Sequence, residues 1–447
     1  MPYIPNTDAD RRAMLERIGV KNFEELIANI PDDLRFKGDF NLPEPLSEME
    51  IFREMNQIGR CNQTATDAVS FLGGGAYDHF IPAAVGHIIS RPEFYTAYTP
   101  YQPEVSQGTL QAIYEYQSMI AELMEMEVAN ASMYDGGSAL AEAAMMALAE
   151  TRKKKILLSR TVHPYYRHII KTYCHGLGAD IQLVEMDNGI TSLADLKAKA
   201  DRDTAAIIIE HPNFLGYLEQ VFEIDAIAKE IDAMFITSND PISLGALEPP
   251  GRYGVDVATG EGQCLGNSLN FGGPYLGVFA AKEKYIRRMP GRIVGATEDK
   301  QGRSGFVLTF QTREQHIRRE KATSNICTNQ ALNALAATVY LALMGKQGIQ
   351  EVASLCLQNS HYLAEQIQQL DNYKLAFTAP FFKEFVVKTP IAPDKVINKL
   401  VDYNIFAGID LTRFDMGIQD GLLIAVTEKR TKDEMDLFVD ALSKIKK

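Results

Sequence analysis

The chain has 447 residues, of which 46% are hydrophobic, and its 45 basic and 58 acidic residues give a net charge of -13. That balance argues against binding to nucleic acid, because a grip on a phosphate backbone needs clustered positive charge. The five cysteines show no CxxC or metal-ligand spacing, and no apolar run approaches the roughly 18 residues of a membrane span. Because the N-terminus also lacks an apolar signal core, we expect a cytoplasmic protein of about two domains, with no metal, nucleic acid or membrane partner.

The first 70 residues predict a helical arm. The stretches DADRRAMLERIG and NFEELIANI carry apolar residues at helical spacing, whereas PDDLR and LPEPLSE interrupt the chain with prolines. We therefore expect residues 1–70 to pack on a larger body or on a partner.

Residues 71–330 alternate between helical and strand patterns. Helical spacing from about residue 114 to 150, interrupted by the turn-like NASMYDGGS, predicts two helices. Short apolar runs then alternate with amphipathic segments, the runs being KKILLS, IQLVEM, AAIIIE, AMFIT and VDVAT. Strands that are apolar on both sides are typical of a parallel sheet covered on both faces. The pattern predicts a large α/β domain over 71–330.

The pattern changes after the apolar helix ALNALAATVYLALMG, which is predicted over 329–345. Beyond it the chain has the pattern of a helix, the strands KLAFT and FFKEFVVK, a helix, the strands NIFAG and GLLIAVTE, and a last helix. That order predicts a small α+β domain which, with the bridging helix, occupies 331–447.

Three local motifs could hold a ligand. The loop GEGQCLG, from Gly260 to Gly266, does not match the dinucleotide fingerprint and favours a place where backbones pass closely. Gly137 and Ser138, before an alanine-rich helix, would suit either a bound anion or an ordinary helix cap. Asp240, after the apolar strand MFITSN, would either pair with a ligand ring nitrogen or start a turn.

The order of these motifs is similar to that of fold-type-I enzymes that use pyridoxal phosphate (PLP). In such enzymes a lysine just ahead of the glycine-rich segment forms the Schiff base with the cofactor. Here no lysine stands between Lys229 and Lys282. The sequence therefore predicts a pocket that lacks its reactive amine.

Longer stretches resemble one enzyme family. The segment from YTAYTPYQPE to DGGSALAEA, together with NFGGPYLGVFA, MPGRIVG and TSNICTNQALNAL, closely resembles the amino-terminal half of glycine decarboxylase, the P-protein of the glycine cleavage system. The resemblance implies a PLP-dependent transferase fold of type I, with a mostly parallel seven-stranded sheet, a smaller C-terminal α+β domain and an N-terminal helical arm. In many bacteria this enzyme is split into two homologous chains, and this chain resembles the one without the lysine.

The resemblance implies that PLP is bound by the lysine-bearing partner and not covalently by this chain. Where the sister half would carry a His-Lys pair, this chain has Gln263 and Cys264, neither of which forms a stable aldimine. The pocket would then persist as a structural relic, with Gly137, Ser138, Asp240 and Gln263 as its remaining residues.

What this chain would supply is one wall of a composite active site. The run EFYTAYTPYQPE offers hydroxyls, an amide and a carboxylate on a segment stiffened by prolines. The candidates are Tyr95, Tyr98, Thr99, Tyr101, Gln102 and Glu104. The alternative is that the tyrosines only pack at an interface. A second set, Asn325, Thr328 and Asn329 in TSNICTNQ, would either cap the long helix or contact ligand.

The implied reaction is the decarboxylation of glycine, with transfer of the aminomethyl group to the lipoyl arm of the H-protein. The implied assembly is an α2β2 heterotetramer with the lysine-bearing second subunit. Two alternatives stay open. One is a noncatalytic scaffold that stabilises the sister subunit, and the other is a self-sufficient PLP enzyme that would use Lys282 or Lys284.

Overall fold

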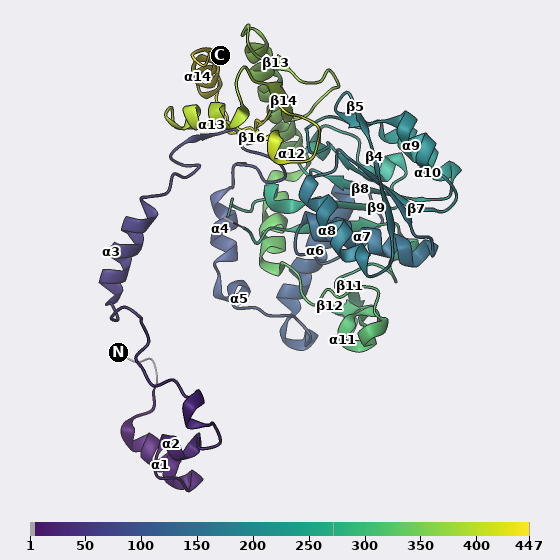
Figure 1. The fold of residues 1–447 in the computed structure, drawn as a ribbon. Helices are drawn as coiled ribbons and strands as arrows, with labels where there is room; N and C mark the ends of the chain where they lie inside the picture. Colours follow the sequence, from purple (N-terminus) through teal and green to yellow (C-terminus); the bar gives the residue numbers. More distant parts are fainter. Residues whose placement is uncertain (1–4, 271, 447) are drawn as a thin grey trace. The chain divides into compact units, whose positions relative to one another are not determined.

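The computed structural model describes residues 5–270 and 272–446, and the chain divides into two compact units between Gln63 and Thr64. Figure 1 draws both units and labels their helices and many of their strands. The first unit covers most of the predicted arm, 1–70, whose last residues belong to the second unit.

The first unit contains the helices α1 (Asp8–Ile18), α2 (Phe23–Leu26) and α3 (Glu48–Gly59). Capping boxes begin α1 and α3, so their first turns are satisfied locally. No residue described in this unit is buried, and the α3 side chains of Phe52 and Met55 are 63% and 60% exposed. These helices therefore have capped ends but no core of their own.

A seven-stranded sheet forms the centre of the second unit, in the order β2, β10, β9, β8, β7, β3, β4. The strands are β2 (Val128–Ala129), β3 (Lys155–Ser159), β4 (Asp180–Val184), β7 (Thr204–His211), β8 (Met234–Asn239), β9 (Val257–Glu261) and β10 (Gly277–Ala281). Neighbours from β4 to β9 run parallel, and β10 runs antiparallel to β9 and β2. The predicted mostly parallel, seven-stranded sheet is confirmed.

Helices cover both faces of this sheet, as the doubly apolar strands require. They are α6 (Gln107–Met124), α7 (Gly136–Thr151), α8 (Pro164–His175), α9 (Leu193–Lys199), α10 (Val221–Glu230) and α12 (Ala331–Gln368). Leu157 and Ile207 enter a core shared with α6, α10 and α12. Their neighbours Ile156 and Ile208 enter a separate core shared with α7 and α8. Alternate residues of one strand thus stabilise opposite layers.

The predicted helix over 329–345 is the first part of α12, which bends at Gly345, where φ is 56°. Beyond α12 lies a four-stranded antiparallel sheet, in the order β13, β14, β17, β16, with a core of its own. Its strands and helices are β13 (Lys374–Leu375), β14 (Glu384–Lys388), α13 (Pro393–Val401), β16 (Ile409–Asp410), β17 (Gly421–Ala425) and α14 (Lys432–Ser443). Because residues 64–447 form one compact unit, the domain border at 330 stays a prediction.

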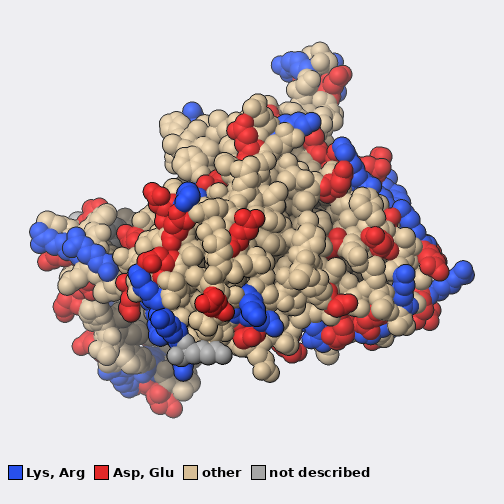
Figure 2. Space-filling model, turned by 90° about the horizontal axis from the view of Figure 1, so that it is seen from above, with Lys and Arg blue, Asp and Glu red and all other residues tan. Residues whose placement is uncertain are grey.

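Short elements complete the second unit. They are β1 (Val69–Ser70) paired with β15 (Ile405–Phe406), β5 (Met186–Asp187) paired with β6 (Ile190–Thr191), β11 (Ile293–Glu298) paired with β12 (Ser304–Thr309), and the helices α4 (Ala83–Ile89), α5 (Pro92–Tyr95) and α11 (Gln315–Arg318). None of the described helices is long and apolar enough to span a membrane. On the face seen in Figure 2, basic and acidic side chains lie intermingled.

Candidate functional site

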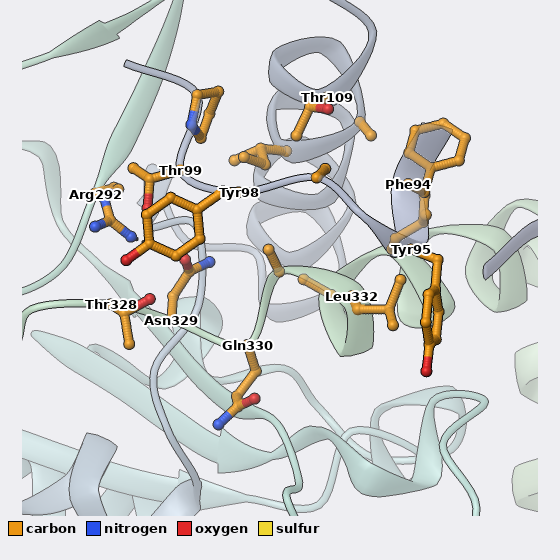
Figure 3. A pocket seen from close by; sticks show the side chains of 17 residues that line it. Phe94, Tyr95, Tyr98, Thr99, Thr109, Arg292, Thr328, Asn329, Gln330 and Leu332 are labelled. Atoms are coloured by element: carbon orange, nitrogen blue, oxygen red, sulfur yellow. Dashed lines mark hydrogen bonds between the residues drawn. The ribbon is translucent and has the colours of Figure 1, made fainter. Parts of the chain in front are cut away.

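Two of the predicted site segments line a single pocket of about 300 Å³ (Figure 3). Tyr95, Tyr98 and Thr99 line it from α5 and the connection that follows. Thr328 and Asn329 line it from the approach to α12. The structure thus brings together two motifs that lie far apart in the sequence.

The two walls of this pocket differ in how firmly they are held. The Thr96 hydroxyl donates to Pro92 O over 2.7 Å and closes α5, after which Tyr98 is 85% exposed. Asn329 is anchored, because its Nδ2 donates to Ala131 O at 3.0 Å and to Ser132 Oγ at 2.9 Å. In Figure 3 the Tyr98 hydroxyl points toward the side of the pocket where Thr328 lies. The exposed phenol of Tyr98 and the anchored amide of Asn329 therefore line the same pocket.

Arg292 is the one charged residue that lines the pocket in the described part of the chain, and it was not among the predicted site residues. It is only 5% exposed. Its Nη1 donates to Asn329 Oδ1 at 3.2 Å and its Nη2 to Cys327 O at 2.6 Å, while its Nε has no partner among the described atoms. Arg292 belongs to the quoted motif MPGRIVG, but nothing in that spacing indicates a buried guanidinium.

Three predicted wall residues do not line the pocket. The ring centroid of Tyr101 lies 5.8 Å from the guanidinium of Arg292, so Tyr101 stands beside the site. Gln102 precedes a short 3-10 helix (Pro103–Val105) without making a side-chain cap. Glu104 is exposed. The role of all three stays a prediction.

The alternative in which TSNICTNQ caps the long helix is wrong. The residue at the N-cap of α12 is Gln330, and its side chain makes no capping hydrogen bond. Asn329 lies one residue too early, and its amide is bound elsewhere. Asn325 lines a different pocket of about 220 Å³, together with Ser138. Ligand contact by these residues stays a prediction.

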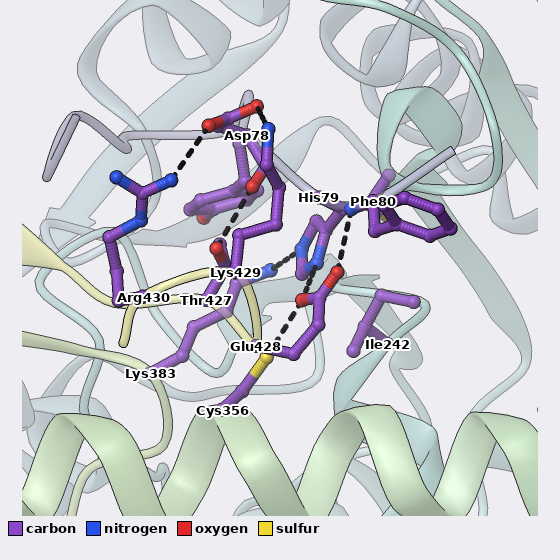
Figure 4. A network of polar contacts seen from close by, with 12 residues as sticks. Asp78, His79, Phe80, Ile242, Cys356, Lys383, Thr427, Glu428, Lys429 and Arg430 are labelled. Atoms are coloured by element: carbon purple, nitrogen blue, oxygen red, sulfur yellow. Dashed lines mark hydrogen bonds and ion pairs between the residues drawn. The ribbon is translucent and has the colours of Figure 1, made fainter. Parts of the chain in front are cut away.

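Lys383, the residue before β14, fills the predicted cofactor pocket. Its Nζ lies 2.7 Å from Asp240 Oδ2, and 2% of its side chain is exposed. The same Nζ lies 3.4 Å from the ring centroid of Tyr77 and 3.1 Å from His79 Nε2 (Figure 4). Burial is the largest single influence and lowers the pKa of Lys383, but the charge and hydrogen bond of Asp240, together with the nearby thiols of Cys264 and Cys356, raise the pKa overall. The acid predicted to face a ring nitrogen is therefore already paired with an internal ammonium.

Gln263 and Cys264 stand where the resemblance places a His-Lys pair, and the amide of Gln263 is fully engaged. Its Oε1 accepts the Tyr77 N–H at 2.8 Å. Its Nε2 donates to Tyr77 O at 3.1 Å and to Asn267 O at 2.8 Å. Gln263 thus joins the segment around Tyr77 to the glycine loop.

The N-terminus of α7 is already occupied by a carboxyl group of the chain, that of Glu261, whose pKa burial raises to about 8. Asp135 and Ser138 form a capping box there, so the capping alternative for Ser138 is confirmed. The Gly136 N–H donates to Glu261 Oε2 at 2.9 Å, and Glu261 accepts two further backbone N–H groups at 2.9 and 3.0 Å. The carboxyl group of Glu261 therefore uses the helix end that would suit a phosphate.

These residues do not fit PLP. Its phosphate would meet the Glu261 carboxylate, and its ring nitrogen would have to displace the Lys383 ammonium from Asp240. A Cβ on Gly137 would lie 2.6 Å from Ile169 Cδ1, which explains that glycine by packing alone. This geometry supports the relic interpretation, which stays a prediction.

The glycine loop is explained by close backbone approach. A Cβ on Gly260 would lie 2.4 Å from Asn239 O, and Gly266 has a φ of 79°. The predicted passage of backbones at this loop is confirmed.

A buried polar network surrounds Lys383 (Figure 4). His79 Nδ1 lies 2.6 Å from Glu428 Oε2, and Cys356 Sγ lies 3.6 Å from the same oxygen. Burial opposes the charge of Glu428, but the hydrogen bond and charge of His79 lower its pKa to about 2. Asp78 pairs with Lys429 Nζ at 2.6 Å close by. His79, Cys356 and Glu428 could offer three atoms to a metal, but the Lys383 ammonium beside His79 disfavours a cation there.

Glu210 makes stability depend on pH. Its Oε2 accepts the His163 N–H at 2.6 Å, and burial, with the charges of Glu384 and Asp240, raises its pKa to about 8. A carboxyl whose pKa is raised in the folded state stabilises the fold below its ordinary pKa and loses that contribution as pH rises. We expect Glu210 to contribute a fall of about 1–2 kcal/mol in the free energy of unfolding from pH 6 to 8. Glu261 and Glu384, whose pKa values are also raised, to about 8 and about 7, add to the same slope, so Glu210→Gln should make the slope shallower without abolishing it, measured by urea denaturation.

Glu185→Gln is the control for that measurement, because the Glu185 side chain is 53% exposed and paired with Arg160. Its slope between pH 6 and 8 should match that of the unmodified chain. Equal slopes in Glu210→Gln and in the unmodified chain would contradict the assignment to Glu210.

Comparison with known proteins gives consistent results. The family described as glycine cleavage system P-protein matches residues 1–442. The chain is 57% identical over 445 residues to the probable glycine dehydrogenase (decarboxylating) subunit 1 of Chloroherpeton thalassium, covering 100% of both chains. A crystal structure of glycine decarboxylase (P-protein) of the glycine cleavage system in inhibitor-bound form superposes with a TM-score of 0.91 at 40% identity, covering 99% of both chains.

A more distant structure shows the fold alone. A C-DES variant with glycine covalently linked to its PLP cofactor superposes with a TM-score of 0.61 at 16% identity, covering 87% of this chain and 98% of the other. With the closer structure, this confirms the predicted type-I fold of PLP-dependent transferases.

Proposed function

From the premise that the chain belongs to the glycine cleavage system P-protein family, we propose that it forms one wall of a composite glycine-decarboxylating site. It is a subunit of the glycine cleavage enzyme. The cofactor PLP, when bound, supplies the electron sink for decarboxylation. In this proposal the lysine-bearing second subunit holds PLP, and the aminomethyl group passes to the lipoyl arm of the H-protein. The assembly is an α2β2 heterotetramer in the cytoplasm.

One observation carries the proposal. The pocket expected to hold PLP is filled by the side chains of Lys383, Gln263 and Glu261. The pocket lined by Tyr98 and Asn329 instead leaves a cavity of about 300 Å³. A wall of hydroxyls and an amide can orient a substrate and exclude water, which is what a chain without a reactive amine can contribute to the reaction.

Tyr98→Ala tests this role in the reconstituted pair of subunits. We expect kcat/KM for glycine–bicarbonate exchange to fall about 10- to 100-fold, because the exposed phenol no longer closes the site. The purified chain alone should show no exchange and should not be labelled by borohydride. Tyr403→Ala is the control, since Tyr403 is 40% exposed and does not line the pocket. Unchanged exchange in Tyr98→Ala would remove the proposed wall.

A scaffold role is the second candidate, and the first unit favours it. The described residues of 5–63 expose many large apolar side chains, including Phe52 and Met55. Such side chains are expected to bind a partner. Full exchange by the sister subunit alone would favour the scaffold and would exclude a composite site.

A further inference from the structure

The N-terminus of α12 opens into the pocket that holds Tyr98 and Arg292. Thr328, Asn329, Gln330, Ala331 and Leu332 all line this pocket, so the first turn of the helix faces it. The Gln330 N–H donates to Ser132 Oγ at 3.2 Å, but Gln330 itself makes no side-chain capping hydrogen bond to the first turn. The backbone N–H groups of a first helical turn carry partial positive charge and favour an anion.

Arg292 adds a second, independent positive charge to the same pocket. The residue is 5% exposed, and both of its acceptors, Asn329 Oδ1 and Cys327 O, are uncharged. Its Nε has no partner among the described atoms. A buried guanidinium without a carboxylate is costly, because its charge is desolvated and not offset.

The N-terminus of α7 shows how this chain satisfies such an end when no ligand is needed. There the Asp135 side chain caps the helix, and a carboxyl oxygen of Glu261 accepts the Gly136 N–H. The N-terminus of α12 has neither a side-chain cap nor a carboxyl group of this kind, although α12 is a much longer helix than α7. The contrast indicates that the anion for α12 comes from outside the chain.

We infer that Arg292 and the first turn of α12 form a binding site for a small carboxylate. The planar guanidinium matches a carboxylate by parallel N–H donors, and the volume of about 300 Å³ admits a molecule of a few heavy atoms. Leu332 and Ile113 make part of the lining apolar, which suits a short organic acid. Two sources share this chemistry, namely the carboxylate of the amino-acid substrate and an acidic side chain of the partner subunit. The identity of the carboxylate rests on the proposed function, whereas the site itself does not.

The site is tested by titrating acetate into the purified chain at constant ionic strength, with chloride as the balancing salt. Binding is followed by calorimetry and by the rise in melting temperature. We expect saturable acetate binding in the unmodified chain, at least about tenfold weaker binding in Arg292→Gln, and partial retention in Arg292→Lys. Arg303→Gln is the matched control, because it removes one positive charge from a side chain that is 78% exposed.

Gln330→Glu separates binding from folding. It adds a carboxylate of nearly unchanged shape at the helix end, so it should weaken acetate binding at least about tenfold while leaving the melting temperature equal or higher. Equal acetate affinity in the unmodified chain, Arg292→Gln and Gln330→Glu would overturn the site. So would an unmodified chain that does not bind acetate at all.

Two further arms identify the source of the carboxylate. If glycine competes with acetate both in the chain alone and in the reconstituted pair, the site receives the substrate carboxylate. If acetate binds the chain alone but is excluded from the pair, an acidic side chain of the partner subunit fills the site. Neither arm needs turnover, so a failure of the carboxylate site is distinguishable from a failure of the composite active site.

Discussion

Replacing Lys383 with methionine is expected to lower the free energy of unfolding by about 3–5 kcal/mol, because it leaves a buried acid without its counter-charge. Lys383 Nζ lies 2.7 Å from Asp240 Oδ2. The neighbouring carboxyls Glu210 and Glu384 are also buried, and burial raises their pKa values to about 8 and about 7. Lys383 is therefore the cation that offsets the charge of Asp240 in an interior that also holds these two acids. Urea denaturation followed by circular dichroism measures the loss.

Two variants make this prediction specific. Lys429→Met removes a partly exposed ammonium, 2.6 Å from Asp78, and should cost no more than about 1 kcal/mol. Adding Asp240→Asn to Lys383→Met should recover much of the stability, because the unpaired charge disappears together with its partner. A Lys383→Met variant as stable as Lys429→Met would show that Asp240 is not held by this pair.

The central sheet could be predicted because its strands carry a local signal. AAIIIE and AMFIT are apolar on consecutive residues, and β7 and β8 have cores on both faces. The aromatic and β-branched residues of FFKEFVVK likewise predict a strand, and β14 lies there. Such a run does not indicate which opposite charge a buried polar side chain meets. Lys383 was missed for this reason, since Asp240 belongs to a distant strand end.

The candidate pocket was predicted in part, for a similar reason. Tyr98 and Asn329 were found through motifs, and the structure places both beside one cavity. The sequence could not show that Arg292 lines the same cavity, because its burial depends on acceptors at Cys327 and Asn329. Glu261 was missed as well, because nothing in the residues around Glu261 indicates that its carboxyl group lies at the N-terminus of α7.

Removing residues 1–63 is expected to weaken pairing with the lysine-bearing subunit at least about 100-fold, which corresponds to about 2.7 kcal/mol. The remaining unit should stay folded, because its cores are built from residues beyond 63. The removed segment exposes apolar side chains that have no core of their own. Burying them on a partner would remove apolar surface from water. Affinity is measured by sedimentation or calorimetry on the two purified subunits.

An apolar stripe on α3 allows the role of residues 1–63 in pairing to be tested without a deletion. Ile51, Met55 and Ile58 follow the spacing of one helical face, and all three are exposed. Changing them together to serine should reproduce most of the loss in affinity, because about 1–2 kcal/mol per large apolar side chain depends on its burial. Changing Arg53 and Gln57, on the other side of α3, to serine is the matched control and should leave pairing intact. Equal pairing by the stripe variant and its control would mean that the apolar stripe does not bind the partner, and the deletion would then have to act through another part of the segment.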